Sequence, residues 1–194
     1  MKPRVVITGM GIVAPNAIGL DNFLKAIQQG KSGITFHQKL KELKFSCCIG
    51  GIPSVSEELK SQYLTSLQLR GFDSAGILYG CIAGMDAWKD AGFKIDRSSS
   101  TDYNSGMVFG TGTSGIEKFR EAIYKLDDNN VKRLGSTVVV QTMASGISAY
   151  LGGILGLGNK VTTNSSACIA GTEALLMGFE RIQSGKASRM LVGS

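Results

Sequence analysis

The sequence has few of the residues that build metal, disulfide and membrane structures. It contains one histidine and four cysteines without a C-x-x-C spacing, which argues against a zinc or redox site. No run of about 18 apolar residues is present to cross a bilayer, and the chain does not start with a signal-peptide pattern. With three prolines and no glycine period of three, disordered proline-rich and collagen-like classes are excluded. We expect a reduced, soluble, cytoplasmic protein without membrane insertion, metal or cofactor.

Positive charge is scattered along the chain rather than gathered. Twenty-one Lys and Arg against 15 Asp and Glu give a net charge of +6. The densest basic run, Lys39, Lys41 and Lys44, alternates with leucines and is typical of a solvated helix face. Nucleic-acid binders usually cluster basic residues with interleaved aromatics, so the pattern argues against a nucleic-acid partner. An acidic protein partner is compatible with this charge.

Glycine is the residue in excess, and short β-branched runs alternate with helical patterns. The 26 glycines predict tight turns and close backbone approaches, and small residues in 75–87 predict a helix that other backbones can approach. Residues from about 31 to 70 have a weaker pattern and are expected on the surface. The alternation predicts a single-domain, layered α/β fold with a largely parallel or mixed sheet. Strands are predicted at 5–8, 105–110, 160–163 and 188–193, and helices at 22–29, 73–91, 116–126, 142–155 and 168–184.

Two glycine-rich segments fit the expression G-x-G-x-x-G/A of dinucleotide-binding turns. The first, at 9–14, runs into a proline before any helical pattern begins. The second, at 110–115, lacks an acidic residue at the end of a following strand. Tight turns or a backbone-lined pocket explain both segments better, and a nucleotide-binding domain built on 110–115 stays open as an alternative.

One cysteine lies where nucleophilic chemistry is expected. The segment 164–171 joins a predicted strand to a predicted helix through small residues and contains Cys168. At the head of a helix, unpaired N–H groups and the positive end of the dipole stabilise a thiolate, and small neighbours let a substrate carbonyl approach. The alternative is that Cys168 is a buried core residue, as free cysteines often are. The other cysteines lack such a setting and are expected to be packing residues: Cys47, Cys48 and Cys81.

Several segments together resemble the N-terminal half of the β-ketoacyl-[acyl-carrier-protein] synthase family, the elongating condensing enzymes of fatty-acid and polyketide synthesis. The similar segments are VVITGMGIVAPNAIG near the start, LRGFDSAGILYGCIAGMDAWKDAGF and VFGTGTSG. The segment MASGISA at 143–149, together with SSAC at 165–168, is nearest to the bacterial type I/II branch. The resemblance spans 1–194 as one N-terminal ketosynthase domain without the C-terminal half. It implies a thiolase-like αβαβα layered fold, here its N-terminal half with a mixed sheet, and a homodimer or heterodimer.

The resemblance implies a decarboxylative Claisen condensation with Cys168 as the nucleophile. Cys168 attacks an acyl thioester on the phosphopantetheine arm of the acyl carrier protein. The enolate formed when malonyl carrier protein loses CO2 then attacks the acyl-Cys168 thioester. The backbone N–H of Cys168 is expected to be one oxyanion donor. The family's two catalytic histidines lie in its C-terminal half, so we expect this chain to supply the nucleophile but to be inactive alone.

Further roles follow from the same resemblance. Thr113 matches a position that gates the acyl pocket, and Met143 and Ala167 fall where the family lines the acyl chain or the dimer seam. We therefore expect these three residues to bind substrate. Basic residues that match positions facing the acidic carrier protein are Arg70, Lys132 and Arg133.

A non-catalytic partner subunit of the chain-length-factor type is the alternative function within the same family. Such a subunit pairs with an active ketosynthase and typically lacks the cysteine. The presence of Cys168 therefore favours the catalytic interpretation.

Overall fold

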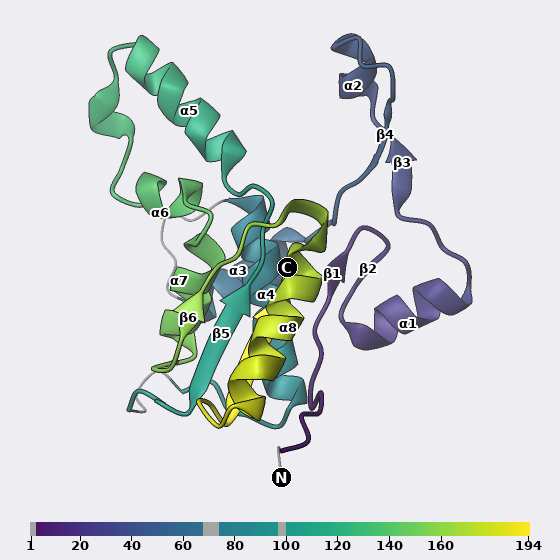
Figure 1. Cartoon of the computed structure of the whole chain (residues 1–194). Coiled ribbons are helices and arrows are strands. Elements are labelled where there is room, and N and C mark those ends of the chain that lie inside the picture. The colour runs from purple at the N-terminus through teal and green to yellow at the C-terminus, as the bar shows by residue number, and fades with distance from the viewer. Residues whose placement is uncertain (1–2, 68–73, 97–99) are drawn as a thin grey trace.

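The computed structural model describes residues 3–67, 74–96 and 100–194, and a parallel sheet of three strands lies at its centre (Figure 1). The strand order is β6–β5–β7, so the middle strand comes first in the chain. Parallel neighbours need crossover connections, and helices supply them between β5 and β6 and between β6 and β7. The strands are β5 (Ser105–Phe109), β6 (Val161–Thr162) and β7 (Arg189–Gly193).

Helices cover both faces of this sheet. Because side chains alternate along a strand, Met107 and Leu191 point to one face while Val192 points to the other. The first face packs on α4 and α7, and the second on α8, where Gly178 lies against Val192. The helices that connect the strands or pack on the sheet are α4 (Ala75–Asp90), α5 (Ile116–Asp127), α6 (Val138–Thr142), α7 (Gly146–Ile154) and α8 (Ala170–Gln183). Two short 3-10 turns lie in the same connections, η1 (Val131–Arg133) and η2 (Ala167–Ile169).

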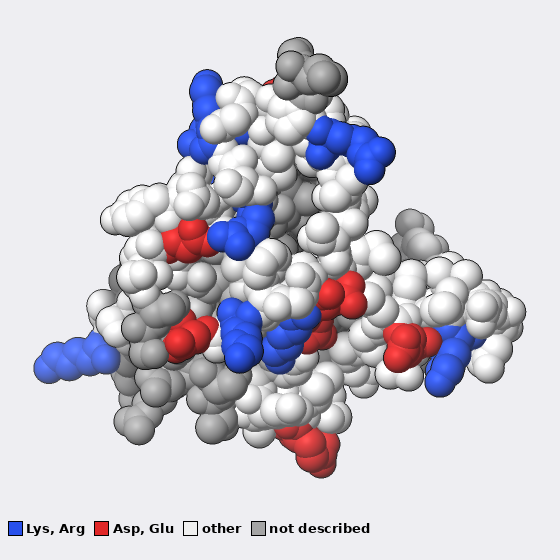
Figure 2. Space-filling model, turned by 90° about the horizontal axis from the view of Figure 1, so that it is seen from below, with Lys and Arg blue, Asp and Glu red and all other residues white. Residues whose placement is uncertain are grey.

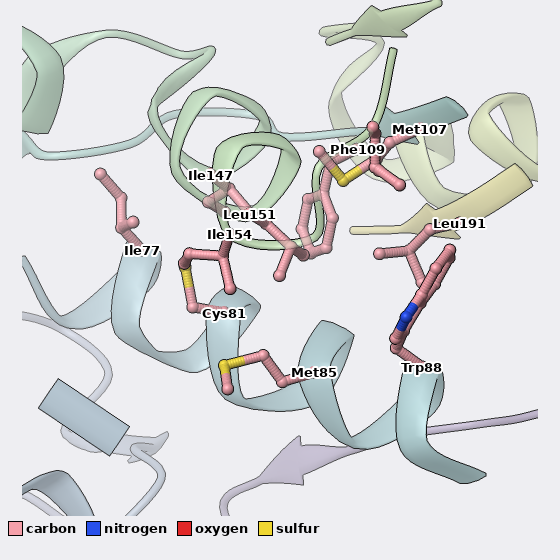
Figure 3. Packing of buried hydrophobic residues seen from close by; sticks show 11 residues of the cluster. Ile77, Cys81, Met85, Trp88, Met107, Phe109, Ile147, Leu151, Ile154 and Leu191 are labelled. Carbon is pink, nitrogen blue, oxygen red and sulfur yellow. The ribbon is translucent and has the colours of Figure 1, made fainter. Parts of the chain in front are cut away.

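The hydrophobic core lies between the sheet and the α4–α7 pair (Figure 3). Burying a large aliphatic side chain stabilises a fold by about 1.5–3 kcal/mol, so this cluster is the main contribution to stability. On α4, Gly80 leaves room for the Ile147 side chain of α7, where a Cβ would come 2.9 Å from it. The backbone at Gly11 lies so close to that of Ala83 on α4 that a Cβ there would overlap it, which confirms the predicted approach of another backbone to the small residues of this helix. The cluster consists of Ile77, Cys81, Met85, Trp88, Met107, Phe109, Ile147, Leu151, Ile154, Leu157 and Leu191.

The predicted strand at 5–8 is wrong. Residues 3–12 form no helix or strand, and Val6 and Ile7 are 61% and 74% exposed. The backbone N–H of Met10 donates to the Asp90 carboxylate at the end of α4 (2.9 Å), so the segment bonds to a helix end and not to the sheet. Between this segment, α8 and β7 runs an apolar groove of about 1310 Å³. A β-branched run therefore favours the extended conformation of a strand, but it forms a strand only where a second strand is placed to pair with it.

A small hairpin and a helix follow this segment. The antiparallel pair β1 (Val13–Ala14) and β2 (Ala17–Ile18) leads into α1 (Leu20–Gln28), which confirms the helix predicted at 22–29 within two residues.

Residues 31–70 contain more regular structure than the sequence predicts. The antiparallel ribbon of β3 (Ile34–Phe36) and β4 (Ile49–Gly51) projects from the body of the molecule with α2 (Gln38–Glu42) at its tip (Figure 1). Lys39 and Lys41 lie exposed on α2, as expected of a solvated helix face. Strands of three residues contain too few alternations to be recognised in the sequence. Helix α3 (Glu57–Leu67) completes this region.

The remaining elements agree with the predictions to within a few residues. Strands β5, β6 and β7 and helices α4, α5 and α8 lie where they were expected. The helix predicted at 142–155 is α7 preceded by the short α6, with Met143 to Ser145 as the break between them.

Candidate functional site

The carboxyl ends of the parallel strands bring two loops of the chain together. Residues 110–115 follow β5, and residues 163–166 follow β6. The backbone N–H of Thr111 donates to the carbonyl oxygen of Asn164 (3.0 Å), and the Ser165 hydroxyl donates to the carbonyl oxygen of Gly112 (3.3 Å). In open α/β sheets ligands bind outside the carboxyl ends of the strands, so this edge is the expected place for a site.

Cys168 lies in the η2 turn directly before α8, at this edge, and its side chain is exposed. Its position at the head of a helix agrees with the sequence, and the buried-core alternative is wrong. The preceding residue, Ala167, has φ +51°, a left-handed conformation that costs a residue with a Cβ about 1–2 kcal/mol. Strained backbone of this kind occurs where a turn presents a nucleophile.

The other cysteines differ from one another in exposure. Cys81 is buried in the core, as expected of a packing residue, and Cys48 is half-buried. Cys47 is exposed in the connection between α2 and β4, so its predicted packing role is wrong.

A pocket of about 440 Å³ opens beside Cys168. Thr113 and Ala167 line it together with Cys168, so three of the predicted site residues share one cavity. Both glycine-rich turns contribute backbone to its wall, as expected of a backbone-lined pocket. Helix α4 closes the pocket with Tyr79 and Gly80.

The remaining predicted site residues lie elsewhere. Met143 ends α6 with 46% of its surface exposed and, within the described ranges, is not part of the pocket wall. Lys132 is exposed in η1, in the connection between α5 and α6. Arg133 belongs to the same turn, but its side chain is not among the parts of the chain that the structure describes. Arg70 as a whole lies outside the described residues. On the face seen in Figure 2, lysines and arginines are spread out with acidic residues between them.

Glu173, which the sequence interpretation missed, anchors the loop that leads to Cys168. Its carboxylate, in the first turn of α8, accepts hydrogen bonds from the Asn164 amide (2.7 Å) and from the Ser166 hydroxyl. These bonds, first that from Ser166 and then that from Asn164, hold the pKa of Glu173 below its usual value. The signal in the sequence is an acidic residue in the first turn of a helix that follows a Ser-Ser loop.

The part of the chain that the structure describes offers neither a metal site nor a membrane span. No group of three or more His, Cys, Asp or Glu side chains there lies close enough to hold a metal ion. None of the helices in the same residues is both long and apolar enough to cross a bilayer.

Solved structures with the same architecture define the class of this fold as thiolase-like. A beta-ketoacyl synthase from Burkholderia phymatum superposes with a TM-score of 0.76 at 24% identity, covering 96% of this chain and 45% of that one. A type II PKS acyl-carrier protein in complex with its ketosynthase bound to the hexaketide gives a TM-score of 0.77 at 21% identity, covering 100% of this chain and 46% of that one. The predicted α/β, thiolase-like fold is confirmed.

The chain belongs to the β-ketoacyl synthase family, since the model of the beta-ketoacyl synthase N-terminal domain matches residues 2–194. It is 31% identical over 114 residues to 3-oxoacyl-[acyl-carrier-protein] synthase 2 of Vibrio harveyi, which is 59% of this chain and 26% of that enzyme. It is 27% identical over 206 aligned residues to chloroplastic 3-oxoacyl-[acyl-carrier-protein] synthase I of Arabidopsis thaliana, which is 99% of this chain and 40% of that enzyme. The chain thus spans less than half the length of these curated relatives.

Proposed function

We propose that this chain contains the acyl-accepting site of a β-ketoacyl-[acyl-carrier-protein] synthase in fatty-acid or polyketide synthesis. The observation that supports the proposal most is the setting of Cys168, an exposed thiol after a left-handed Ala167 at the carboxyl edge of the sheet, beside a pocket. Family membership gives this geometry its chemical meaning, because the family's reaction begins with acyl transfer to a cysteine.

The proposed first half-reaction is acyl transfer to Cys168. The Cys168 thiolate attacks the thioester carbonyl of an acyl group on the phosphopantetheine arm, and the tetrahedral intermediate expels the pantetheine thiolate, which takes up a proton to become the free thiol. The pocket of about 440 Å³ lies in the size range of small-molecule sites. Thr113 and Ala167 are proposed to contact the acyl group from its walls, whereas the exposed Met143 is better suited to a dimer seam.

The proposed second half-reaction uses groups beyond those this chain brings to the pocket. A malonyl thioester loses CO2, and its enolate carbon attacks the acyl-Cys168 carbonyl, releasing the thiolate and the β-ketoacyl product. Decarboxylation needs donors for the developing enolate oxygen. The single histidine, His37, lies in the β3–β4 ribbon with Nε2 3.0 Å from the carbonyl oxygen of Gly50, and it does not line the pocket. We therefore assign this chain the nucleophile and not the decarboxylation step.

The proposed partner is the acyl carrier protein, which is acidic and presents the thioester. Lys132 is exposed in η1, and Arg133 follows it in the same turn. Exposed cations of this kind steer an acidic partner and set its salt dependence. Together with Arg70 they are the residues that we propose bind the carrier protein. The enzyme itself is proposed to be a dimer in the cytoplasm.

The test is intact-protein mass spectrometry after incubation with an acyl thioester of the carrier protein. Wild type is expected to gain the mass of one acyl group, and Cys168→Ala is expected to gain none. Cys47→Ala is the matched control, since Cys47 is exposed but lies far along the chain in the ribbon region. A folded wild-type chain without an adduct would contradict the proposal and favour the chain-length-factor alternative. An adduct that survives Cys168→Ala but disappears in Cys47→Ala would also contradict it.

A further inference from the structure

A single carboxylate joins the two parts of the loop that leads to Cys168. Glu173 Oε2 accepts one hydrogen bond from the side-chain amide of Asn164, just after β6, and one from the hydroxyl of Ser166, which directly precedes Ala167. The same Asn164 amide also donates to the carbonyl oxygen of Ala170, the first residue of α8 (2.9 Å). The loop and the helix are therefore tied together on both sides of the η2 turn.

We propose that Glu173 is the positioning residue of the nucleophile: by holding Asn164 and Ser166 it keeps the turn in the shape that presents Cys168 to the pocket. The inference rests on the proposed function, because it takes Cys168 as the nucleophile. Glu173 itself is not part of the pocket wall, so it acts through the loop and not on the substrate.

The backbone around Cys168 explains why such an anchor is needed. Ala167 adopts φ +51°, a conformation that an alanine does not keep without support from its surroundings. Ser166, immediately before it, is fixed by the carboxylate, and the backbone N–H of Ile169 reaches back to the carbonyl oxygen of Ser166 (3.3 Å). Releasing Ser166 therefore frees the turn to relax to an ordinary backbone conformation, which changes where the thiol points.

The charge of Glu173 suits this role. Hydrogen bonds to an ionised acceptor are about twice as strong as those between neutral groups, and Glu173 stays ionised because both donors lower its pKa. Its place in the first turn of α8 puts the negative charge at the positive end of the helix dipole. A glutamine at this position keeps an acceptor oxygen for the same donors but lacks the charge.

The experiment measures how fast iodoacetamide alkylates each cysteine in the folded protein, with peptide mass spectrometry to separate the sites. The variants are Glu173→Ala, Glu173→Gln and the matched control Glu180→Ala, an exposed glutamate on the same helix. Glu173→Ala removes both hydrogen bonds to the carboxylate and is expected to slow alkylation of Cys168 at least about tenfold, since even one hydrogen bond to a charged group is worth that much. Glu173→Gln should recover part of the rate, because it keeps the acceptor oxygen but not the charge. Glu180→Ala should match wild type, and alkylation of the exposed Cys47 should not change in any variant.

Three results would overturn the inference: a wild-type rate at Cys168 in Glu173→Ala, a glutamine variant as slow as the alanine variant, or equal slowing at Cys168 and Cys47. If Glu173→Ala does not fold, Ser166→Ala removes the hydrogen bond between Ser166 and Glu173 from the loop side. This variant must then slow alkylation of Cys168 without slowing that of Cys47. Failure of the proposed function gives a different result, since wild type would then alkylate normally yet accept no acyl group from a carrier-protein thioester.

Discussion

Gly110 at the end of β5 lies so close to Ala170 at the start of α8 that a Cβ on Gly110 would come 2.5 Å from the Ala170 carbonyl oxygen. Ala170 is two residues from Cys168. This backbone contact therefore sets the distance between the glycine-rich loop 110–115 and the η2 turn that contains Cys168. The second contact across the same gap joins the N–H of Thr111 to the carbonyl oxygen of Asn164 (3.0 Å).

The first prediction therefore concerns Gly110. Gly110→Ala should lower the free energy of unfolding by about 1–3 kcal/mol, because the methyl group forces α8 and the loop apart. It should also slow acylation of Cys168. Chemical denaturation and the acyl-adduct assay measure the two effects. Gly153→Ala is the control, since nothing lies within 4 Å of a Cβ there and Gly153 does not line the pocket. Equal behaviour of the two variants would show that the contact does not set the site.

A second prediction separates three of the four cysteines by their reactivity. Burial raises the pKa of the Cys81 thiol to about 12, so at pH 8 it is almost entirely protonated and inaccessible. A thiol reagent should label Cys47 and Cys168 in the native protein and Cys81 only after unfolding. Because the folded-state pKa is raised, the neutral thiol contributes stability below its unfolded pKa, and this contribution is lost as pH rises from about 9 towards 12. Native labelling of Cys81 at the rate of Cys47 would refute the prediction.

A third prediction concerns acid stability at the amino end of β5. Asp102 accepts a hydrogen bond from the Ser105 hydroxyl (2.6 Å) and pairs with the Arg189 guanidinium (2.6 Å). The hydrogen bond from Ser105, then the backbone N–H of Asn104 and the Arg189 charge, hold the pKa of Asp102 below its usual value. Its contribution is therefore present above the unfolded pKa of about 4 and is lost as pH falls through the lower folded pKa.

Asp102→Asn should reduce the free energy of unfolding at pH 7 by up to about 1 kcal/mol, a modest value because the pair is about one-third exposed. The variant should also lose part of the decrease in stability that wild type undergoes below about pH 4. Thermal denaturation from pH 2.5 to pH 7 measures both effects, with the exposed Asp127→Asn as the control. Identical pH profiles for wild type and Asp102→Asn would disprove the assignment.

A fourth prediction tests docking of the carrier protein. Lys132→Glu combined with Arg133→Glu should raise the KM of the acylation half-reaction several-fold at low salt, where KM is the concentration of acyl carrier-protein thioester that gives half the maximal rate of adduct formation at Cys168. The effect should become smaller as salt shortens the screening length. The KM for a free acyl-pantetheine thioester should stay unchanged, because that substrate has no acidic surface. Lys39→Glu with Lys41→Glu on α2 is the matched control. An unchanged KM and salt dependence for the carrier protein would reject these residues as docking sites.

The secondary structure of the centre of the molecule could be predicted because it depends on local pattern. Strand β5 contains the apolar run Met107 to Phe109 and ends at a glycine-rich turn, and α4 and α8 have enough turns for their periodicity to be recognised. The ribbon of β3 and β4 could not be predicted, since its pairing joins residues about 15 apart in strands of three. The run at 5–8 has the composition of a strand, yet whether it pairs depends on a second strand lying beside it. The local sequence does not show whether such a strand is present.

The sequence by itself determined the family, the strands β5 to β7 with the helices α4, α5 and α8, and the cysteine at the head of a helix, because each of these depends on short stretches of residues. The tertiary structure alone decided that Thr113 shares a pocket with Cys168 while Met143 does not, and that Cys47 is exposed while Cys81 is buried. It also decided that Glu173 holds the loop before the nucleophile. The pocket joins segments far apart in the chain that come together only when the helices pack on the sheet, and such a contact leaves no periodic pattern in the sequence.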